Sequence, residues 1–191
     1  MRTLKHGDVE YWLMQEHSSA NSLVVWVPAP REIVAQMLAL AGVSGGDVVY
    51  DLGCGDGRVL ISAVKDFAAK RAVGYELRQD LCEISRRLVR QLDLQDRIEI
   101  INGDLLKADL SGASVVTLYL TGEANRMLSQ RLERGLRPGS RVVTYLFPVS
   151  GWLPAKEVDL ENLCFTEGKF IGKLYLYVMP QASLHARTGG A

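Results

Sequence analysis

Three glycines alternate along one short stretch of the chain, between two apolar runs. The stretch VVYDLGCGDGRVL runs from Val48 to Leu60, and its glycines are Gly53, Gly55 and Gly57. Glycine has no Cβ, so such a turn can adopt positive φ angles and let a ligand approach the backbone closely. The apolar run before the turn predicts a buried strand, and the run after it predicts a helix. We therefore expect a ligand to bind at this turn.

Acidic side chains around the turn restrict the kind of ligand. Asp51 precedes the first glycine, and Asp56 stands between the second and the third. A dinucleotide-binding turn reads G-x-G-x-x-G and holds a pyrophosphate. Here the third glycine of that pattern would fall at position 58, which is Arg58. Acids disfavour a pyrophosphate and suit a nucleoside with a cationic centre, so the turn predicts S-adenosylmethionine (SAM), whose sulfonium and α-ammonium groups are positive.

Two further acids follow later runs that predict strands. Glu76 ends the run AVGYE, about twenty residues after the turn, where a carboxylate can accept both hydrogen bonds of a ribose diol. Asp104 follows the next run and could accept a hydrogen bond from the adenine amino group, with Leu105 against the ring face. One acid at a strand end is often a helix cap. Three acids at three successive strand ends are better explained by a nucleoside ligand.

Strands and helices alternate over most of the sequence. The apolar patterns predict strands at 45–53, 71–77, 96–104, 113–120 and 140–147, and helices at 30–41, 57–70, 79–94 and 124–136. This order is typical of a doubly wound, Rossmann-like α/β sheet. Two final strands, at 151–160 and 172–180, have no helix between them, which predicts an antiparallel edge on a seven-stranded sheet.

Length and composition favour one ordinary α/β enzyme domain. The 191 residues suit a single domain, which we expect over 1–191, with 1–29 covering the cofactor and 183–191 as a frayed tail. The 22 basic and 22 acidic residues balance, and a nucleic-acid binder usually carries a basic excess. The cysteines and histidines show no metal-ligand spacing. No apolar run approaches the ~18 residues of a membrane span. With no signal-peptide pattern at the N-terminus, we expect a cytoplasmic monomer.

The end of the fourth predicted strand bears on the methyl acceptor. It reads TLYLTG, without the Asn/Asp-Pro-Pro-aromatic motif that serves planar nitrogens, and without a Pro-Cys pair for cytosine carbon. Tyr119 is the aromatic residue at this strand end. Its ring could form a wall for an aliphatic ammonium group by cation–π attraction. An equally good interpretation is a half-buried strand tyrosine with a satisfied hydroxyl.

Longer stretches resemble the archaeal protein-lysine N-methyltransferases and their mitochondrial relatives, which methylate lysines of membrane proteins. The resemblance runs from about Trp26 to about Met179, in VPAPREIVAQMLALAGVSGGDVVYDLGCGDGRVLISAVK, INGDLLKADLSGASVVTLYL and LRPGSRVVTYLFPVSGWLPAKEV. It implies a SAM-dependent enzyme that methylates lysine ε-amino groups of proteins. Its implied acceptor-side residues are Tyr119 and Trp26. With the turn and the acids above, the cofactor-binding candidates are Ala29, Asp51, Gly53, Cys54, Gly55, Gly57, Glu76, Leu77, Asp104, Leu105 and Leu118.

Two departures from the family pattern leave the acceptor open. The lead-in Val27-Pro28-Ala29-Pro30, which lies over the cofactor in the family, has alanine where threonine is usual. The fifth strand ends in Thr144-Tyr145-Leu146-Phe147, where the family has Ser-His-acid-Phe. A methyltransferase for RNA or a small molecule is therefore an alternative hypothesis, as is a SAM-binding module without catalysis. Tyr145 is either a packing residue or a second aromatic of the acceptor channel.

Overall fold

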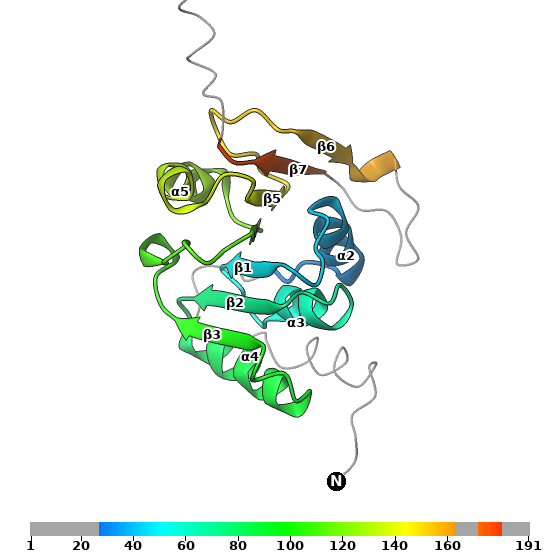
Figure 1. Ribbon diagram of the computed structural model, residues 1–191, viewed down its shortest axis with the longest axis vertical. Helices are drawn as coiled ribbons and strands as arrows, with labels where there is room; N and C mark the ends of the chain where they lie inside the picture. The colour runs from blue at the N-terminus through cyan, green and yellow to red at the C-terminus, as the bar shows by residue number, and fades with distance from the viewer. Residues whose placement is uncertain (1–26, 163–171, 181–191) are drawn as a thin grey trace, which may run out of the picture.

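The chain folds around one mixed sheet with helices on both faces (Figure 1). This computed structural model describes residues 27–162 and 172–180. In these ranges the sheet has seven strands in the order β3-β2-β1-β4-β5-β7-β6. The strands are β1 (Val48–Leu52), β2 (Arg71–Glu76), β3 (Ile98–Asn102), β4 (Val115–Leu118), β5 (Arg141–Tyr145), β6 (Lys156–Asp159) and β7 (Lys173–Val178). The helices are α2 (Arg31–Leu40), α3 (Arg58–Lys65), α4 (Gln79–Gln91) and α5 (Gly122–Gly135), with 3-10 turns η1 (Leu105–Lys107) and η2 (Leu160–Asn162).

Strands β1 to β5 pair in parallel, and β7 pairs antiparallel with both β5 and β6. The order reverses beside β1, whose neighbours are β2 and β4. In the register, Asp51 of β1 lies opposite Gly74 of β2 and Thr117 of β4. This confirms the predicted Rossmann-like sheet with an antiparallel C-terminal pair. The carboxyl ends of β1 to β5 share one edge, which is where such sheets bind ligands.

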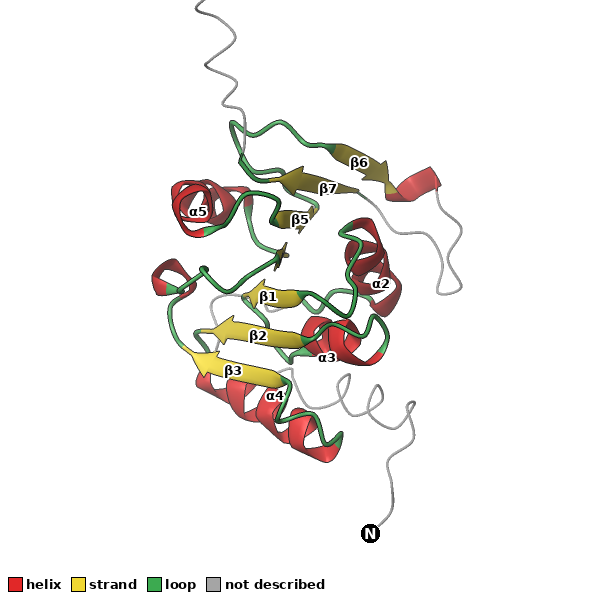
Figure 2. Ribbon diagram, in the orientation of Figure 1, coloured by secondary structure: helices red, strands yellow, loops and turns green. Residues whose placement is uncertain are grey.

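Two apolar layers enclose the sheet. Buried residues of α2, α3 and α4 pack on one face, and those of α5 pack on the other (Figure 2). The apolar side of α2 is buried through Ile33, Val34, Met37 and Leu38, and Leu40 is half-buried. Within the residues that the structure describes, no helix has the length and hydrophobicity to cross a membrane.

The structure shortens several predicted elements. The helix predicted over 57–70 ends at Lys65, because Ala68 adopts a φ of 58° and the Ala69 amide donates to the Ala63 carbonyl. Pro30 precedes α2 as its N-cap and is not in the first turn. The expectations for residues 1–26 and for the tail at 183–191 lie outside the described residues.

A polar cluster joins the amino ends of three parallel strands. The carboxylate of Asp47, just before β1, accepts hydrogen bonds from the Ser44 amide and from the hydroxyls of Ser44 and Ser114. It also pairs with Arg141 of β5. The Arg141 guanidinium donates in turn to the carbonyls of Ala41 and Gly42, which follow α2. This Asp47 cluster lies at the end of the sheet opposite to the glycine turn.

Candidate active site

The glycine turn leaves β1 in a left-handed path. Gly53, Gly55 and Gly57 have φ angles of 87°, 53° and 81°, a region that other residues rarely adopt. The amides of Gly53 and Cys54 both donate to the Tyr75 carbonyl, at 2.8 and 3.0 Å. A Cβ at Gly53 would lie 2.9 Å from Leu120 Cδ2. The turn is therefore close-packed on its inner side and keeps its backbone bare toward the pocket.

Glu76 supports this turn directly. One carboxylate oxygen accepts from the Gly55 amide at 2.9 Å, and the other accepts from the Arg78 amide at 2.9 Å. The side chain is 9% exposed. Each carboxylate oxygen has two lone pairs, so these bonds are compatible with further hydrogen bonds from a ribose diol. Glu76 has a structural role that the sequence did not reveal, in addition to its predicted role as the ribose acid.

Gly74 is a residue that the sequence analysis missed. A Cβ there would lie 2.5 Å from Cys54 Sγ and 2.5 Å from Leu60 Cδ1. Glycine in β2 thus makes room for the Cys54 side chain behind the turn. Burial first, and then the nearby Asp51 carboxylate, raise the pKa of the Cys54 thiol, so it stays protonated at neutral pH. A glycine inside a strand pattern is the signal that could have indicated this close approach.

Asp51 ends β1 as a buried carboxyl group. Its side chain is 5% exposed, and its Oδ1 accepts from the Thr117 hydroxyl at 2.7 Å. Burial raises the pKa of Asp51 to about 7. The charges of Asp56 and Glu76 act in the same direction, whereas the Thr117 hydrogen bond opposes the shift. The acid is therefore poised to ionise near neutral pH, and a bound cation would favour its charged form.

Asp56 has a different environment from the one that the sequence suggested. Its carboxylate is 1% exposed and pairs with Arg58, whose Nη2 lies 2.6 Å from Oδ2. Arg58 Nε also donates to both carboxylate oxygens, and Nη1 donates to the Ala29 carbonyl at 2.8 Å. Asp56 is thus neutralised by its neighbour. Arg58 fastens the Val27-Pro28-Ala29-Pro30 lead-in to the glycine turn.

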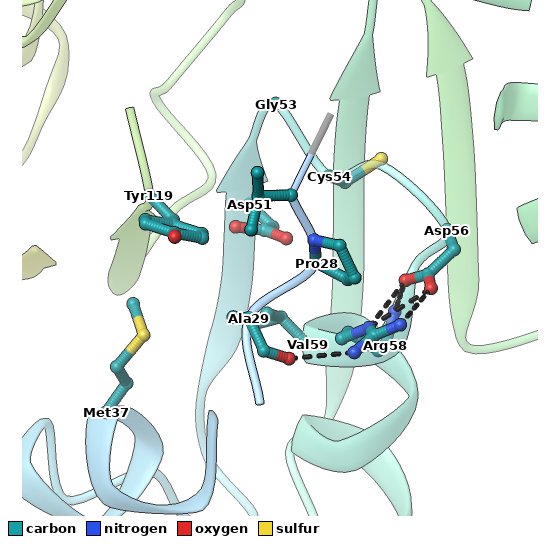
Figure 3. A pocket seen from close by; sticks show the side chains of 11 residues that line it. Pro28, Ala29, Met37, Asp51, Gly53, Cys54, Asp56, Arg58, Val59 and Tyr119 are labelled. Atoms are coloured by element: carbon teal, nitrogen blue, oxygen red, sulfur yellow. Dashed lines mark hydrogen bonds and ion pairs between the residues drawn. The ribbon is translucent and has the colours of Figure 1, made fainter. Parts of the chain in front are cut away.

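A pocket opens between the lead-in, the turn and α2 (Figure 3). The described residues that line it are Val27, Pro28, Ala29, Met37, Asp51, Gly53, Cys54, Asp56, Arg58, Val59 and Tyr119. In the figure, Met37 and Tyr119 lie on one side of Asp51, and Arg58 lies on the other. Of the two predicted acceptor residues, the structure places Tyr119 here, whereas Trp26 lies outside the described residues. The sequence motifs did not predict Met37, Val59 or Arg58 as residues of the site.

The predicted nucleoside residues lie at the ends of β2 and β3. Leu77 is 73% exposed, so its side chain is accessible to a ring. Asp104 accepts from the Leu106 amide at 2.9 Å and caps η1, which begins with the half-buried Leu105. Capping uses one oxygen of the Asp104 carboxylate. The Leu118 side chain, in contrast, is fully buried in the core on the α5 face and does not line the pocket.

The acceptor side of the pocket is aromatic. The rings of Tyr119 and Tyr145 are 4.8 Å apart between centroids and are tilted by 39°. Tyr145 is 6% exposed, so it packs behind Tyr119 and does not line the pocket. Burial raises the pKa of Tyr119, which therefore carries a neutral phenol at pH 7. After Tyr145, Leu146 adopts a φ of 69°, and its side chain occupies the space that a Cβ of Gly172 would need.

The groups at this site fit SAM, the ligand that the sequence predicts. A bare left-handed turn, a buried carboxyl group for an ammonium, a carboxylate for a diol and an exposed leucine for a ring are all at one edge of the sheet. A diphosphate would face the acids Asp51 and Glu76, which disfavour it.

Comparisons with known proteins find related methyltransferases. A family model described as the ANTKMT methyltransferase domain matches residues 51–156. A protein-lysine N-methyltransferase of Saccharolobus islandicus is 40% identical over 156 residues, which are 82% of this chain and 94% of the relative. The adenine nucleotide translocase lysine N-methyltransferase of Mus musculus is 30% identical over 135 residues. That match covers 71% of this chain and 58% of the relative, so the chain spans just over half the length of this mouse protein.

A solved structure is similar over the same region. An RNA methyltransferase from Salinibacter ruber, in complex with S-adenosyl-L-homocysteine, is 40% identical to the chain with a TM-score of 0.74. The match covers 81% of this chain and 94% of that one. The predicted fold and the predicted family resemblance are confirmed.

Proposed function

The chain belongs to the family of the ANTKMT methyltransferase domain, and from this premise we propose that it transfers methyl groups from SAM to lysine ε-amino groups of proteins. SAM, when bound, supplies a methyl group activated by a positive sulfur. The relatives support the proposed acceptor, since the S. islandicus and M. musculus proteins are both named lysine N-methyltransferases.

Different residues of the chain would bind the ammonium, ribose and adenine groups of the cofactor. Asp51, fixed by Thr117, would face the α-ammonium group. Glu76 would accept from the ribose hydroxyls while it holds the Gly55 amide. The exposed Leu77 and the half-buried Leu105 would contact the adenine ring. These contacts position a bound nucleoside, and positioning is most of what an in-line methyl transfer requires.

The observation that carries the lysine acceptor is the composition of the pocket beside Asp51. Tyr119 and Met37 line it with a ring and a thioether, and its described residues offer no carboxamide to pair with a planar base. Such a wall suits an aliphatic amine stem. Lysine must lose a proton before attack, and the pKa of its ammonium group in water is about 10.4. Burial between apolar side chains and beside a cation favours the neutral amine, so the channel itself would help to deprotonate it.

Labelled SAM and cell lysate provide the test. We expect the purified protein to label proteins, the label to resist nuclease, and mass spectrometry to place it on lysine. As a control, the Asp51→Asn variant should label proteins more weakly than the wild type. Label that survives protease but is lost with nuclease would reject lysine as the acceptor. It would still be consistent with a SAM-dependent methyltransferase.

RNA is the second candidate acceptor. The S. ruber protein, at 40% identity, is named an RNA methyltransferase. The balanced charge of this chain gives RNA less support than protein, because phosphate binding depends on a basic excess. The nuclease arm of the same experiment separates the two. The cytoplasmic location and the monomeric state stay predictions.

A further inference from the structure

Arg58 is the one cationic side chain among the described residues that line the pocket. Its partners include the Asp56 carboxylate and the Ala29 carbonyl, at N–O distances of 2.6–3.1 Å. Its side chain is 20% exposed. A guanidinium has five N–H donors in a fixed plane, so it can bind more than two acceptors at once. The arginine is therefore a preoriented donor group on the pocket wall.

Asp51 supplies the opposite charge on the same wall. Figure 3 shows the Asp51 carboxylate and the Arg58 guanidinium as separate groups, with Pro28 between them in this view. An anion and a cation on one pocket wall are complementary to an α-amino acid, which presents an ammonium and a carboxylate group. We infer that Arg58 binds the α-carboxylate of the methionine part of SAM, opposite to the ammonium site at Asp51.

Residue 29 supports this assignment. The resemblance places threonine at this position, and Ala29 has no hydroxyl group to offer. The Ala29 carbonyl instead accepts from Arg58, so the lead-in helps to hold the guanidinium at the pocket. Because Asp56 already balances part of the Arg58 charge, we expect a moderate contribution of about ten-fold in affinity. The inference rests on SAM as the cofactor in the proposed function, and it is independent of the acceptor.

Decarboxylated SAM is the probe that isolates the contact. It lacks the carboxylate and is more positive than SAM, so the acids of the pocket would otherwise attract it more strongly. By calorimetry, we expect the wild-type protein to bind SAM about ten-fold more tightly than decarboxylated SAM. Arg58→Met should lower SAM affinity about ten-fold and remove this preference. Arg71→Met is the matched control, because Arg71 also pairs with an acid, Glu99, and lies outside the pocket; it should keep the preference.

Other outcomes overturn the inference. Equal weakening of both ligands in Arg58→Met would assign Arg58 only to the lead-in and turn, and equal binding by the wild type would remove the contact altogether. If Arg58→Met does not fold, NMR of the wild type replaces it: the Arg58 side-chain N–H signals should shift with SAM and not with decarboxylated SAM, and equal shifts reject the assignment. If the wild-type protein prefers SAM over decarboxylated SAM but does not label lysine, the result would reject the proposed acceptor and keep the Arg58 contact.

Discussion

Burial has the largest effect on the protonation of Asp51. The carboxyl group is 5% exposed and has two acidic neighbours, so its pKa of about 7 exceeds the ordinary value near 4. A group with a raised folded-state pKa stabilises the fold at low pH and loses that contribution as pH rises through about 7. Ionisation of Asp51 is thus unfavourable below about pH 7, and a cationic ligand would offset that cost.

The first prediction concerns the pH dependence of SAM binding. Because the charged form of Asp51 is the one that attracts an ammonium group, affinity should rise as the pH increases from 6 through about 7. Asp51→Asn should weaken binding at pH 8 by about 10- to 100-fold, since a charged hydrogen bond contributes about 1.5–3 kcal/mol, and should flatten the pH profile. Calorimetry across this range measures both effects. An unchanged pH slope in Asp51→Asn would assign the titration to another group.

Glu76 provides a second test, because it serves the turn and the ligand together. Glu76→Ala should weaken SAM binding by about 2–3 kcal/mol and should shift the Gly55 amide resonance even without ligand. Glu99→Ala, an exposed acid on the neighbouring strand, is the control. Unaltered SAM affinity in Glu76→Ala would remove this residue from the site.

The third prediction separates the acceptor side from the cofactor side. Tyr119→Ala removes the aromatic wall and leaves the turn intact, so it should lower turnover more than it lowers SAM affinity. Tyr119→Phe keeps the ring and should retain most of the activity. The raised pKa of Tyr119 disfavours a tyrosinate, so its hydroxyl is not expected to act as the base. Steady-state rates and calorimetry measure the two quantities. The reverse pattern would make Tyr119 a cofactor or core residue.

At the residue scale, short motifs predicted the side chains whose place at a turn or strand end is set by nearby sequence. The G-x-G-x-G turn and the acid at the end of each strand were recognisable because backbone conformation and strand ends depend on nearby sequence. The hydrogen bond from Arg58 to the Ala29 carbonyl was not, since it depends on how the lead-in folds back over the turn. The inward packing of Leu118 depends on the whole sheet in the same way.

At the scale of elements, β2 is shaped by its one glycine. The fourth prediction is that Gly74→Ala destabilises the protein by about 1–3 kcal/mol, because the new methyl group would overlap Cys54 and Leu60. Gly46→Ala is the matched control, since nothing lies within 4 Å of a Cβ there. Urea unfolding measures both variants. Equal stability of the two would show that the Cys54 side chain can move at no cost.

Periodicity predicted the elements better than their ends or their final order. Apolar runs located β1 to β5 and the helices between them, because burial on a sheet imposes those patterns. Helix α3 stops at Lys65 through the left-handed Ala68, for which alanine gives no signal. The last strand, β7, lies inside the sheet between β5 and β6. Antiparallel pairing was predictable from the missing helix, but the side on which β7 enters depends on tertiary packing.

At the scale of the whole molecule, the Asp47 cluster ties α2 to strands β1, β4 and β5. Burial raises the pKa of Asp47, but hydrogen bonds from Ser114 and Ser44 and the charge of Arg141 outweigh it, so the pKa is lowered overall. The lowered folded-state pKa means that this stabilisation is present above about pH 4 and is lost as pH falls further.

The fifth prediction is that Asp47→Ala lowers the free energy of unfolding by about 3 kcal/mol at pH 7, because Arg141 loses its buried partner. The loss should shrink as the pH falls from 4 toward 3, because the wild-type carboxylate then begins to take up a proton. Asp96→Ala, an exposed acid, should have an effect near zero. Urea titrations at both pH values measure the difference, and a pH-independent loss would contradict the electrostatic explanation.

The distance between this cluster and the pocket has a consequence for substitutions. The Asp47 cluster lies at the amino ends of β1, β4 and β5, whereas Tyr119, with Tyr145 behind it, lies at the carboxyl ends. Because the two ends share no side-chain contact described here, we expect substitutions around Tyr119 to change the methyl acceptor at little cost to the stability that the Asp47 cluster provides.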